Sequence, residues 1–227
     1  MARVRYRTDE MPLLHRAVFP AQMNKFQFEV PTEQFLTLDD MEIPQVKHIH
    51  ISLAGRAVGP ETLVAVNRFL CRAHGSQKMR LDILPCVTGV RPEAITCTDL
   101  TILRMHIRVS ADMVLEFIER LQRLQALVCS NVTTRGMQAD VSVAPLDAHE
   151  PMEPLNTSLR SLAMAPNVDR RDYDTVALAK YLLVRLPSLK RFSTFRVSKQ
   201  SVLDFAREYA SLYPHLANIH GMSWSYW

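Results

Sequence analysis

The sequence predicts an α/β protein built from repeated strand–helix units, and three observations lead to this prediction. The decapeptide RVSADMVLEF, which begins at Arg108, returns 88 residues later as RVSKQSVLDF with six of its ten letters unchanged. In both places a short apolar run precedes the decapeptide. An amphipathic helical pattern follows Ser110 and Ser198. One strand–helix unit cannot bury its own apolar face, so stacked units must repeat the same apolar positions.

The apolar letters shared by the two decapeptides predict equivalent core positions. Each helix is expected to begin directly after its serine, because the serine side-chain oxygen accepts a backbone N–H that has no partner inside the helix. We therefore expect Val109 and Val197 to be buried just before the two helices. Leu115 and Leu203 are expected to enter one continuous core.

Further copies of the apolar pattern stand outside the decapeptides. The matching spans begin at Val46, Leu100, Leu124, Leu159, Leu189 and Leu216. The first gap, of 54 residues, has room for one more strand around Leu81, and the other gaps are 24 to 35 residues. The span from Leu159 to Val168 reads Leu-x-x-Leu-x-Met-x-x-Asn-Val.

This spacing resembles the leucine-rich-repeat family, whose consensus is Leu-x-x-Leu-x-Leu-x-x-Asn/Cys-x-Leu with a period of about 20–29 residues. Six or seven irregular repeats would cover residues 44–222. The asparagine is absent from most copies and the gaps are uneven, which departs from a regular curve. The resemblance implies a solenoid with a curved parallel sheet on its concave face. A doubly wound α/β domain is the alternative, although no G-x-G-x-x-G or Walker loop is present.

Three regions fall outside the repeats. Residues 1–43 are apolar but aperiodic and are predicted to cap the first repeat. Residues 139–158 contain three prolines and four acidic residues without Lys or Arg, which predicts an acidic, flexible insertion. Residues 223–227 form an aromatic tail, interpreted either as a C-terminal cap or as an exposed binding anchor made by Trp224, Tyr226 and Trp227.

Composition narrows the function classes. Hydrophobic residues make up 48% and charged residues 22% of the 227, as in an ordinary globular protein, and the net charge of +4 is only a weak indication of nucleic-acid binding. No apolar run is long enough for a membrane helix or a secretory signal, so we expect no membrane partner. The four cysteines lack a Cys-x-x-Cys pair. Buried free thiols and a cytoplasmic or nuclear location are therefore expected.

Candidate chemistry is sparse. His48 and His50 share one face of a predicted strand and could begin a zinc site, but no further ligand follows at suitable spacing. Ser110 and Ser198 are better explained as helix caps than as nucleophiles. No nucleophile motif or paired carboxylates stand out. We therefore predict no enzyme, no catalytic or metal-binding residue and no cofactor.

The resemblance assigns binding to the concave face, which is lined by the residues between the apolar strand positions. The predicted binding residues are His48, His50, Ile102, Arg104, His106, Val128, Arg191, Ser193, Asn218 and His220. The middle of this row is small and apolar, whereas its ends are basic or carry imidazoles. Such a surface suits a protein ligand that reaches the ends with acidic groups. The alternative is that this surface is merely solvated and the interface lies on an edge or a cap.

Two functions follow from these expectations. The first is a leucine-rich-repeat adaptor or scaffold subunit that binds a protein partner. Many proteins of this architecture are substrate receptors of ubiquitin ligases, although residues 1–43 contain no F-box-like segment. The second, less favoured, is an RNA-associated factor of the nuclear-export type. A net charge of +8 outside the acidic insertion favours it slightly, whereas the predicted strands lack interleaved aromatic and basic residues.

Overall fold

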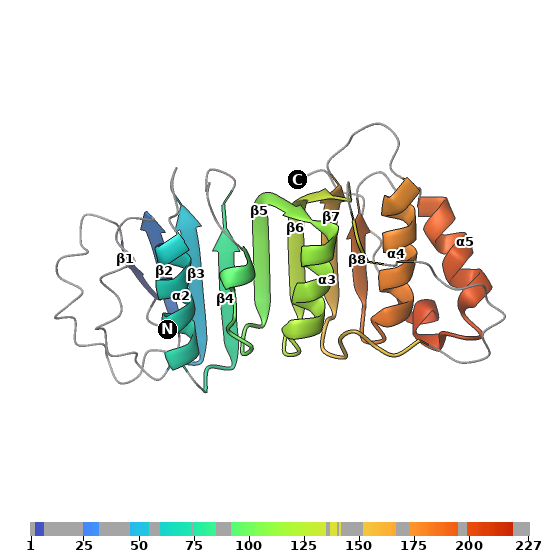
Figure 1. The fold of residues 1–227 in the computed structure, drawn as a ribbon. Coiled ribbons are helices and arrows are strands. Elements are labelled where there is room, and N and C mark those ends of the chain that lie inside the picture. Colours follow the sequence, from blue (N-terminus) through green and yellow to red (C-terminus); the bar gives the residue numbers. More distant parts are fainter. Residues whose placement is uncertain are drawn as a thin grey trace. The chain divides into compact units, whose positions relative to one another are not determined.

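A computed structural model of the chain shows an α/β protein with parallel sheets, as the sequence predicted (Figure 1). The structure describes residues 3–6, 25–31, 46–54, 60–73, 75–84, 92–134, 137–139, 141, 152–166, 173–194 and 199–219. The chain divides into two compact units, Met1–Ile107 and Arg108–Trp227.

The first unit is a parallel sheet whose strand order follows the chain. Its strands are β1 (Arg3–Tyr6), β2 (Lys25–Pro31), β3 (His48–Ala54), β4 (Lys78–Ile83) and β5 (Ile102–Ser110), the last of which runs past the end of the unit. Helix α2 (Pro60–Arg72) lies over β2 and β3, and η3 (Pro92–Ala94) precedes β5. The ring centroids of Phe26 on β2 and Phe69 on α2 are 5.9 Å apart, so this contact joins helix and sheet.

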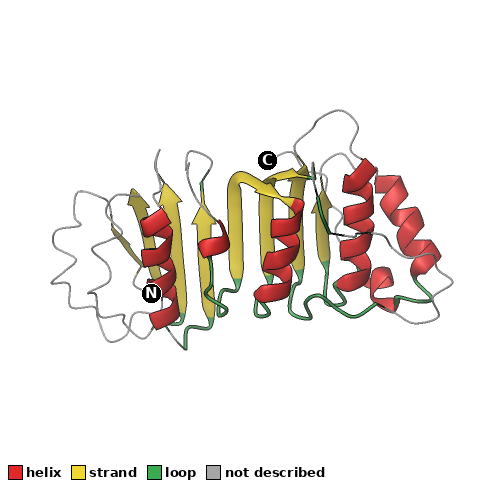
Figure 2. Cartoon of the chain, in the orientation of Figure 1, coloured by secondary structure: helices red, strands yellow, loops and turns green. Residues whose placement is uncertain are grey.

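The second unit has the same plan. Strands β6 (Ala126–Thr133), β7 (Ser161–Pro166) and β8 (Arg191–Thr194) are parallel and adjacent in chain order. The helices are α3 (Ala111–Arg120), α4 (Tyr173–Arg185), α5 (Lys199–Tyr209) and the short η4 (Pro214–Asn218). In each unit the described α-helices lie on one side of the strands (Figure 2).

The predicted apolar positions are the buried positions of the strands. Five copies bury the first, fourth and sixth residues of their span, which are Val46, Ile49 and Ile51, then Leu100, Leu103 and Met105, then Leu124, Leu127 and Cys129, then Leu159, Leu162 and Met164, then Leu189, Phe192 and Thr194. The strand expected around Leu81 is β4, which buries Met79 and Leu81. Its first position is Ser76, whose hydroxyl donates to the carbonyl of Val46 at 2.8 Å.

A tight turn recurs at the first position of most copies. The backbone N–H of that residue donates to the carbonyl three residues earlier, at distances of 2.9 to 3.4 Å. The pairs are Ser76 with Ala73, Leu100 with Cys97, Leu124 with Leu121, Leu189 with Leu186, and Leu216 with Tyr213. In the copy that begins at Leu159, the side-chain oxygen of Asn156 takes the place of that carbonyl, at 2.9 Å. The turn therefore repeats together with the buried positions.

The first decapeptide folds as predicted. Ser110 is the N-cap of α3, and its hydroxyl accepts the N–H of Met113 at 3.2 Å. Val109 is buried just before the helix, and Leu115 lies in the buried stripe together with Phe117 and Ile118.

The second decapeptide departs from the first at one described position. Helix α5 buries Phe205 and Ala206, the counterparts of Phe117 and Ile118. Leu203, however, is only half-buried, so the prediction that it enters the core like Leu115 is wrong. The tilted rings of Phe205 and Tyr209 have centroids 4.2 Å apart, and Phe205 is the buried member of this pair. Val197 and Ser198 lie outside the described residues.

Residues 1–43 contribute strands β1 and β2, although we expected an aperiodic cap there. β2 pairs in parallel with β3 over seven residues, so the sheet extends beyond the predicted repeats. The segment KFQFEVP alternates apolar and polar residues, and Phe26 is 1% exposed. Alternation with a period of two indicates a strand here, but the segment is short and lies outside the strand–helix repeats, so β2 was not predicted.

The end of the acidic segment is folded rather than a flexible insertion. In residues 152–158, Leu155 and Asn156 are buried. The Asn156 amide donates to the carbonyls of Ile118 and Leu121 at 2.9 and 3.0 Å, and so satisfies orphan carbonyls at the end of α3. Residues 142–151 lie outside the residues that the structure describes.

The last expected copy forms no strand in its described part. Leu216 is buried, but the residues around it form η4. Asn218 therefore lies on a 3₁₀ helix, and its prediction as a strand residue is wrong. Pro214, which fixes φ and starts this turn, favours the helical conformation. His215 also anchors the turn, because its Nε2 lies 2.8 Å from the carbonyl oxygen of Leu183.

Truncation of the two decapeptide leucines should have unequal effects. Leu115→Ala removes a buried side chain and should lower the free energy of unfolding by about 2–5 kcal/mol. Leu203→Ala removes a half-buried one and should cost roughly 1 kcal/mol. Urea denaturation of both variants measures this difference, with the exposed Arg207→Ala as control. Equal losses at Leu115 and Leu203 would contradict the difference in burial.

Replacement of Asn156 tests the turn in which a side chain substitutes for a carbonyl. Asn156→Ala leaves two buried carbonyls and the N–H groups of Ser158 and Leu159 without this partner. We expect a loss of about 2–4 kcal/mol, because each unsatisfied buried group costs about 1–3 kcal/mol and relaxation recovers part of it. The neighbouring exposed Thr157→Ala is the matched control. A loss under about 0.5 kcal/mol for Asn156→Ala would show that the amide is dispensable.

Candidate functional site

The polar face of the first unit's sheet gathers basic side chains from neighbouring strands. Alternation along each strand puts His48 and His50 on the face opposite the buried Ile49 and Ile51. Register then aligns the rows across the sheet. The first row is Arg3, Lys25, His48 and Lys78, the second is Arg5, Gln27, His50, Arg80 and Ile102, and the third is Glu29, Ser52, Asp82 and Arg104.

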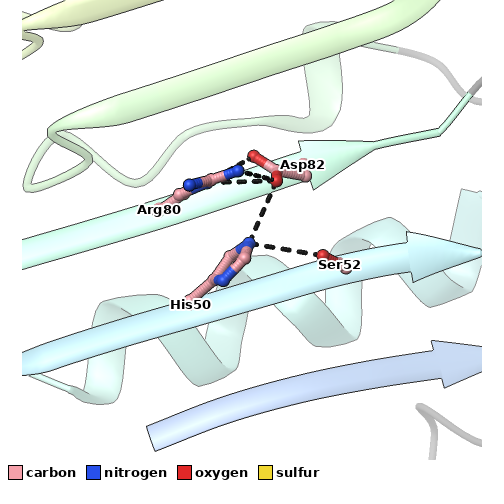
Figure 3. Close-up of polar contacts among 4 residues, drawn as sticks. All are labelled: His50, Ser52, Arg80 and Asp82. Carbon is pink, nitrogen blue, oxygen red and sulfur yellow. Dashed lines mark hydrogen bonds and ion pairs between the residues drawn. The ribbon is translucent and has the colours of Figure 1, made fainter. Parts of the chain in front are cut away.

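Asp82 is the centre of a polar cluster on this face (Figure 3). His50 Nε2 lies 3.0 Å from Asp82 Oδ2. The Arg80 Nε donates to Oδ1 and Oδ2 at 2.8 and 3.0 Å, and a second guanidinium nitrogen also contacts Oδ2. Ser52 Oγ approaches the same His50 nitrogen at 3.3 Å. Asp82 is only 6% exposed, so protein groups rather than water balance the charge of its carboxylate.

The cluster keeps Asp82 ionised. Burial acts to raise the pKa of this carboxyl, but the hydrogen bonds from His50 and Arg80, together with their charges, more than offset burial and lower the pKa to about 2. A bidentate guanidinium is well suited to this role, because its two N–H groups match the carboxylate geometry.

The cluster contains Ser, His and Asp but lacks the geometry of a catalytic triad. In a triad one imidazole nitrogen faces the nucleophile and the other faces the carboxylate. Here the Ser52 hydroxyl and the Asp82 carboxylate both face His50 Nε2, so the ring cannot relay a proton between them. Within the described ranges, no group of three or more His, Cys, Asp or Glu side chains is placed to hold a metal ion.

Three cations of this face stand apart from the cluster. Among the described residues, the ion pairs of the face join Asp82 to His50 and Arg80, and Lys25, Lys78 and Arg104 take no part in them. Arg104 is in register with Asp82, yet its Nε is buried without a hydrogen-bond partner. The face thus carries positive charge that no described carboxylate neutralises.

The polar face of the second unit has a different character. Register aligns Ala126, Ser161 and Arg191 in one row and Val128, Ala163 and Ser193 in the next. Apart from the exposed Arg191, these residues are small and partly exposed. This face therefore carries mostly small, weakly polar side chains, as the composition of the middle strands predicted.

The predicted binding residues are brought together unit by unit. His48, His50, Ile102 and Arg104 lie in adjoining rows of the first unit, and His106 follows on β5 as a partly exposed residue. Val128, Arg191 and Ser193 share the face of the second unit. His220, Trp224, Tyr226 and Trp227 lie outside the described residues, so both interpretations of the aromatic tail stay predictions.

Sequence reasoning missed the residues that complete the basic face. Lys78, Arg80 and Asp82 alternate with the buried Met79 and Leu81 in the segment KMRLDI. The alternation was visible, but the register with β3 was not, and register alone brings Asp82 beside His50.

The described cysteines fit structural rather than reactive thiols. Cys97 and Cys129 are buried and free, as expected, whereas Cys71 is only half-buried. Burial, reinforced by the neighbouring Cys71 thiol, raises the pKa of Cys97 to about 12. Burial also raises the pKa of Cys129. Such thiols are poor nucleophiles at neutral pH.

Comparison of the chain with protein-family models, with curated proteins and with solved structures found no match. Within the part of the chain that the structure describes, no helix has both the length and the apolar character needed to cross a membrane.

The Asp82 cluster should make stability depend on acid pH. The folded pKa of about 2 lies below the ordinary value of 3.8, so the unfolded chain binds more protons between these values. Stability from this group is complete above about pH 4 and is lost as the pH falls toward 2, a change of roughly 2 kcal/mol.

Urea denaturation between neutral pH and about pH 2.5 tests this dependence. The stability advantage of the wild type over Asp82→Asn should shrink as the pH falls, whereas its difference from the exposed Asp204→Asn should change little. An advantage over Asp82→Asn that stays constant with pH would contradict the lowered pKa.

Proposed function

We propose that the chain is built from leucine-rich-repeat-type units and serves as a non-enzymatic protein-interaction module, an adaptor or scaffold subunit of a larger complex. The observation that carries this proposal is the joint recurrence of buried positions and of the turn before them. Five spans bury their first, fourth and sixth residues, and the same backbone hydrogen bond opens most of them. Stacked repeats need this identity from copy to copy.

Strand order supports repeats over a doubly wound domain. A doubly wound sheet reverses its strand order at the point where it binds a ligand. Within each unit the strands instead follow one another in chain order, and the described α-helices lie on one side. The other face of each sheet is left partly exposed and offers a binding surface.

The character of the polar faces supports binding rather than catalysis. His50, Ser52 and Asp82 cannot act as a proton relay, and Asp82 is held as an ionised structural partner of Arg80. A role as a ubiquitin-ligase substrate receptor belongs to the same proposal as one form of adaptor. The free thiols of Cys97 and Cys129 support a reducing compartment, the cytoplasm or the nucleus.

RNA binding is the second candidate, and the uncompensated cations of the first unit favour it. Sequence-specific binding of single-stranded RNA usually relies on aromatic side chains that stack on bases. The three rows of the basic face contain no Phe, Tyr or Trp; their rings are the imidazoles of His48 and His50, and His50 is hydrogen-bonded to Asp82. A protein partner therefore accounts better for this surface.

Affinity purification from native extract tests the module. We expect a protein partner to remain bound after washing at about 0.5 M salt and after ribonuclease treatment, because apolar contacts are screened little. Ala163→Arg, which puts a bulky cation in the middle of the second unit's face, should reduce recovery of that partner by about tenfold. Ser211→Arg, an equal change at an exposed position, should leave recovery unchanged.

Two results would overturn this proposal. One is a purification that recovers RNA but no protein partner, with the RNA binding lost steeply between low and moderate salt. The other is equal recovery of the partner with Ala163→Arg and Ser211→Arg. Matching thermal transitions of the two variants make sure that neither result reflects unfolding.

A further inference from the structure

The first row of the basic face carries two lysines with a histidine between them. Lys25, His48 and Lys78 occupy directly matched positions on β2, β3 and β4. Neighbouring strands lie about 4.8 Å apart, so the two lysines are on either side of the imidazole. The ion pairs of the described residues give neither lysine a carboxylate partner.

The following rows add to the excess of positive charge. Arg80 and Arg104 join the two lysines, while the register places two acids, Glu29 and Asp82, in the third row. The Asp82 carboxylate is already occupied by Arg80 and His50. The face therefore has cations available to an outside anion, and Arg104 has a buried Nε that lacks a partner.

We propose that the basic face of the first unit, formed by Lys25, His48, His50, Lys78, Arg80 and Arg104, binds an extended acidic peptide segment of the partner protein. This inference rests on the proposed function, which supplies a protein as the ligand. Charge complementarity selects an acidic segment, because carboxylates would pair with the two lysines of the first row and steer the encounter.

The dimensions of the face suit an extended chain. Lys25 and Lys78 are two strand spacings apart, about 10 Å, and an extended peptide presents side chains of one side at every second residue, about 6.7 Å apart. Successive carboxylates on that side could therefore pair with both lysines, whose side chains are long and flexible. Arg104 offers a planar guanidinium to a further carboxylate, with the partly exposed Ile102 beside it for an apolar contact.

A peptide fits this face better than a nucleic acid does. Phosphate groups would also satisfy the cations, but the face has no Phe, Tyr or Trp for base stacking among its described residues, and the His50 imidazole is already held by Asp82. Nucleic acid is therefore the competing result of the test.

Fluorescence anisotropy of the full chain tests the inference with a labelled ten-residue peptide of alternating Glu and Ser. The expected result is saturable binding that weakens with salt, and no binding of the matched Gln–Ser peptide. Lys78→Glu, at an exposed position, should weaken binding by about tenfold. Lys190→Glu, which makes the same charge change at an exposed site of the second unit, should stay within about twofold.

Lys78→Gln provides a second variant that removes the charge without reversing it, and it should weaken binding by a smaller factor. Each variant is compared with the wild type by thermal unfolding, so a loss of binding with an unchanged unfolding temperature is due to the altered face and not to unfolding. Equal effects of Lys78→Glu and Lys190→Glu would overturn the inference. Tighter binding of a single-stranded decauridine than of the acidic peptide would overturn it as well.

Failure of this inference is distinguishable from failure of the proposed function. If the acidic peptide does not bind but Ala163→Arg still abolishes recovery of a salt-resistant partner, the interaction module stands and the basic face is not its peptide site. If neither the peptide nor a salt-resistant protein binds, the module itself is wrong.

Discussion

Strand register is the constraint on which both faces of these parallel sheets depend. Side chains alternate with a period of two, so a slip of one residue between β3 and β4 would bury Arg80 and expose Leu81. The recurrent turn before strands β4 to β8 fixes where each of them begins, because the N–H of the first buried residue is tied to a point three residues back. Burial of Leu81 or Leu103 and partial exposure of Arg80 or Arg104 on the other face thus share one cause.

Register also decides which charges the fold must neutralise itself. Asp82 and His50 are 32 residues apart and become hydrogen-bonded only because their strands align. A buried carboxylate is expensive without partners, and the Arg80 fork and the His50 ring reduce that cost. No comparable partner stands by Lys25 and Lys78 among the described residues, so the charge of that row is left for solvent or a ligand.

The sequence predicted what depends on neighbours along the chain. The cap at Ser110, the stripe through Leu115 and the buried spacing from Leu124 and Leu159 were all readable from short segments. The capping role of Asn156 could not be read in this way, because its partners at the end of α3 are 35 and 38 residues away. The contact between Asp82 and His50 could not be read either, since only the register of β3 and β4 brings them together. Strand β2 was not predicted for a different reason, because its short alternating segment lies outside the recognised strand–helix repeats.

The two copies of the decapeptide show what a repeat must preserve. Phe117 and Phe205 are both buried, as are Ile118 and Ala206, although Ala206 is the smaller side chain. Leu203, at the margin of the stripe, is only half-buried, whereas Leu115 is buried. The centre of the stripe is therefore preserved between the two copies, while its margin differs. Helix positions that face water need not be preserved at all, as the exposed Gln200 in the place of Asp112 shows.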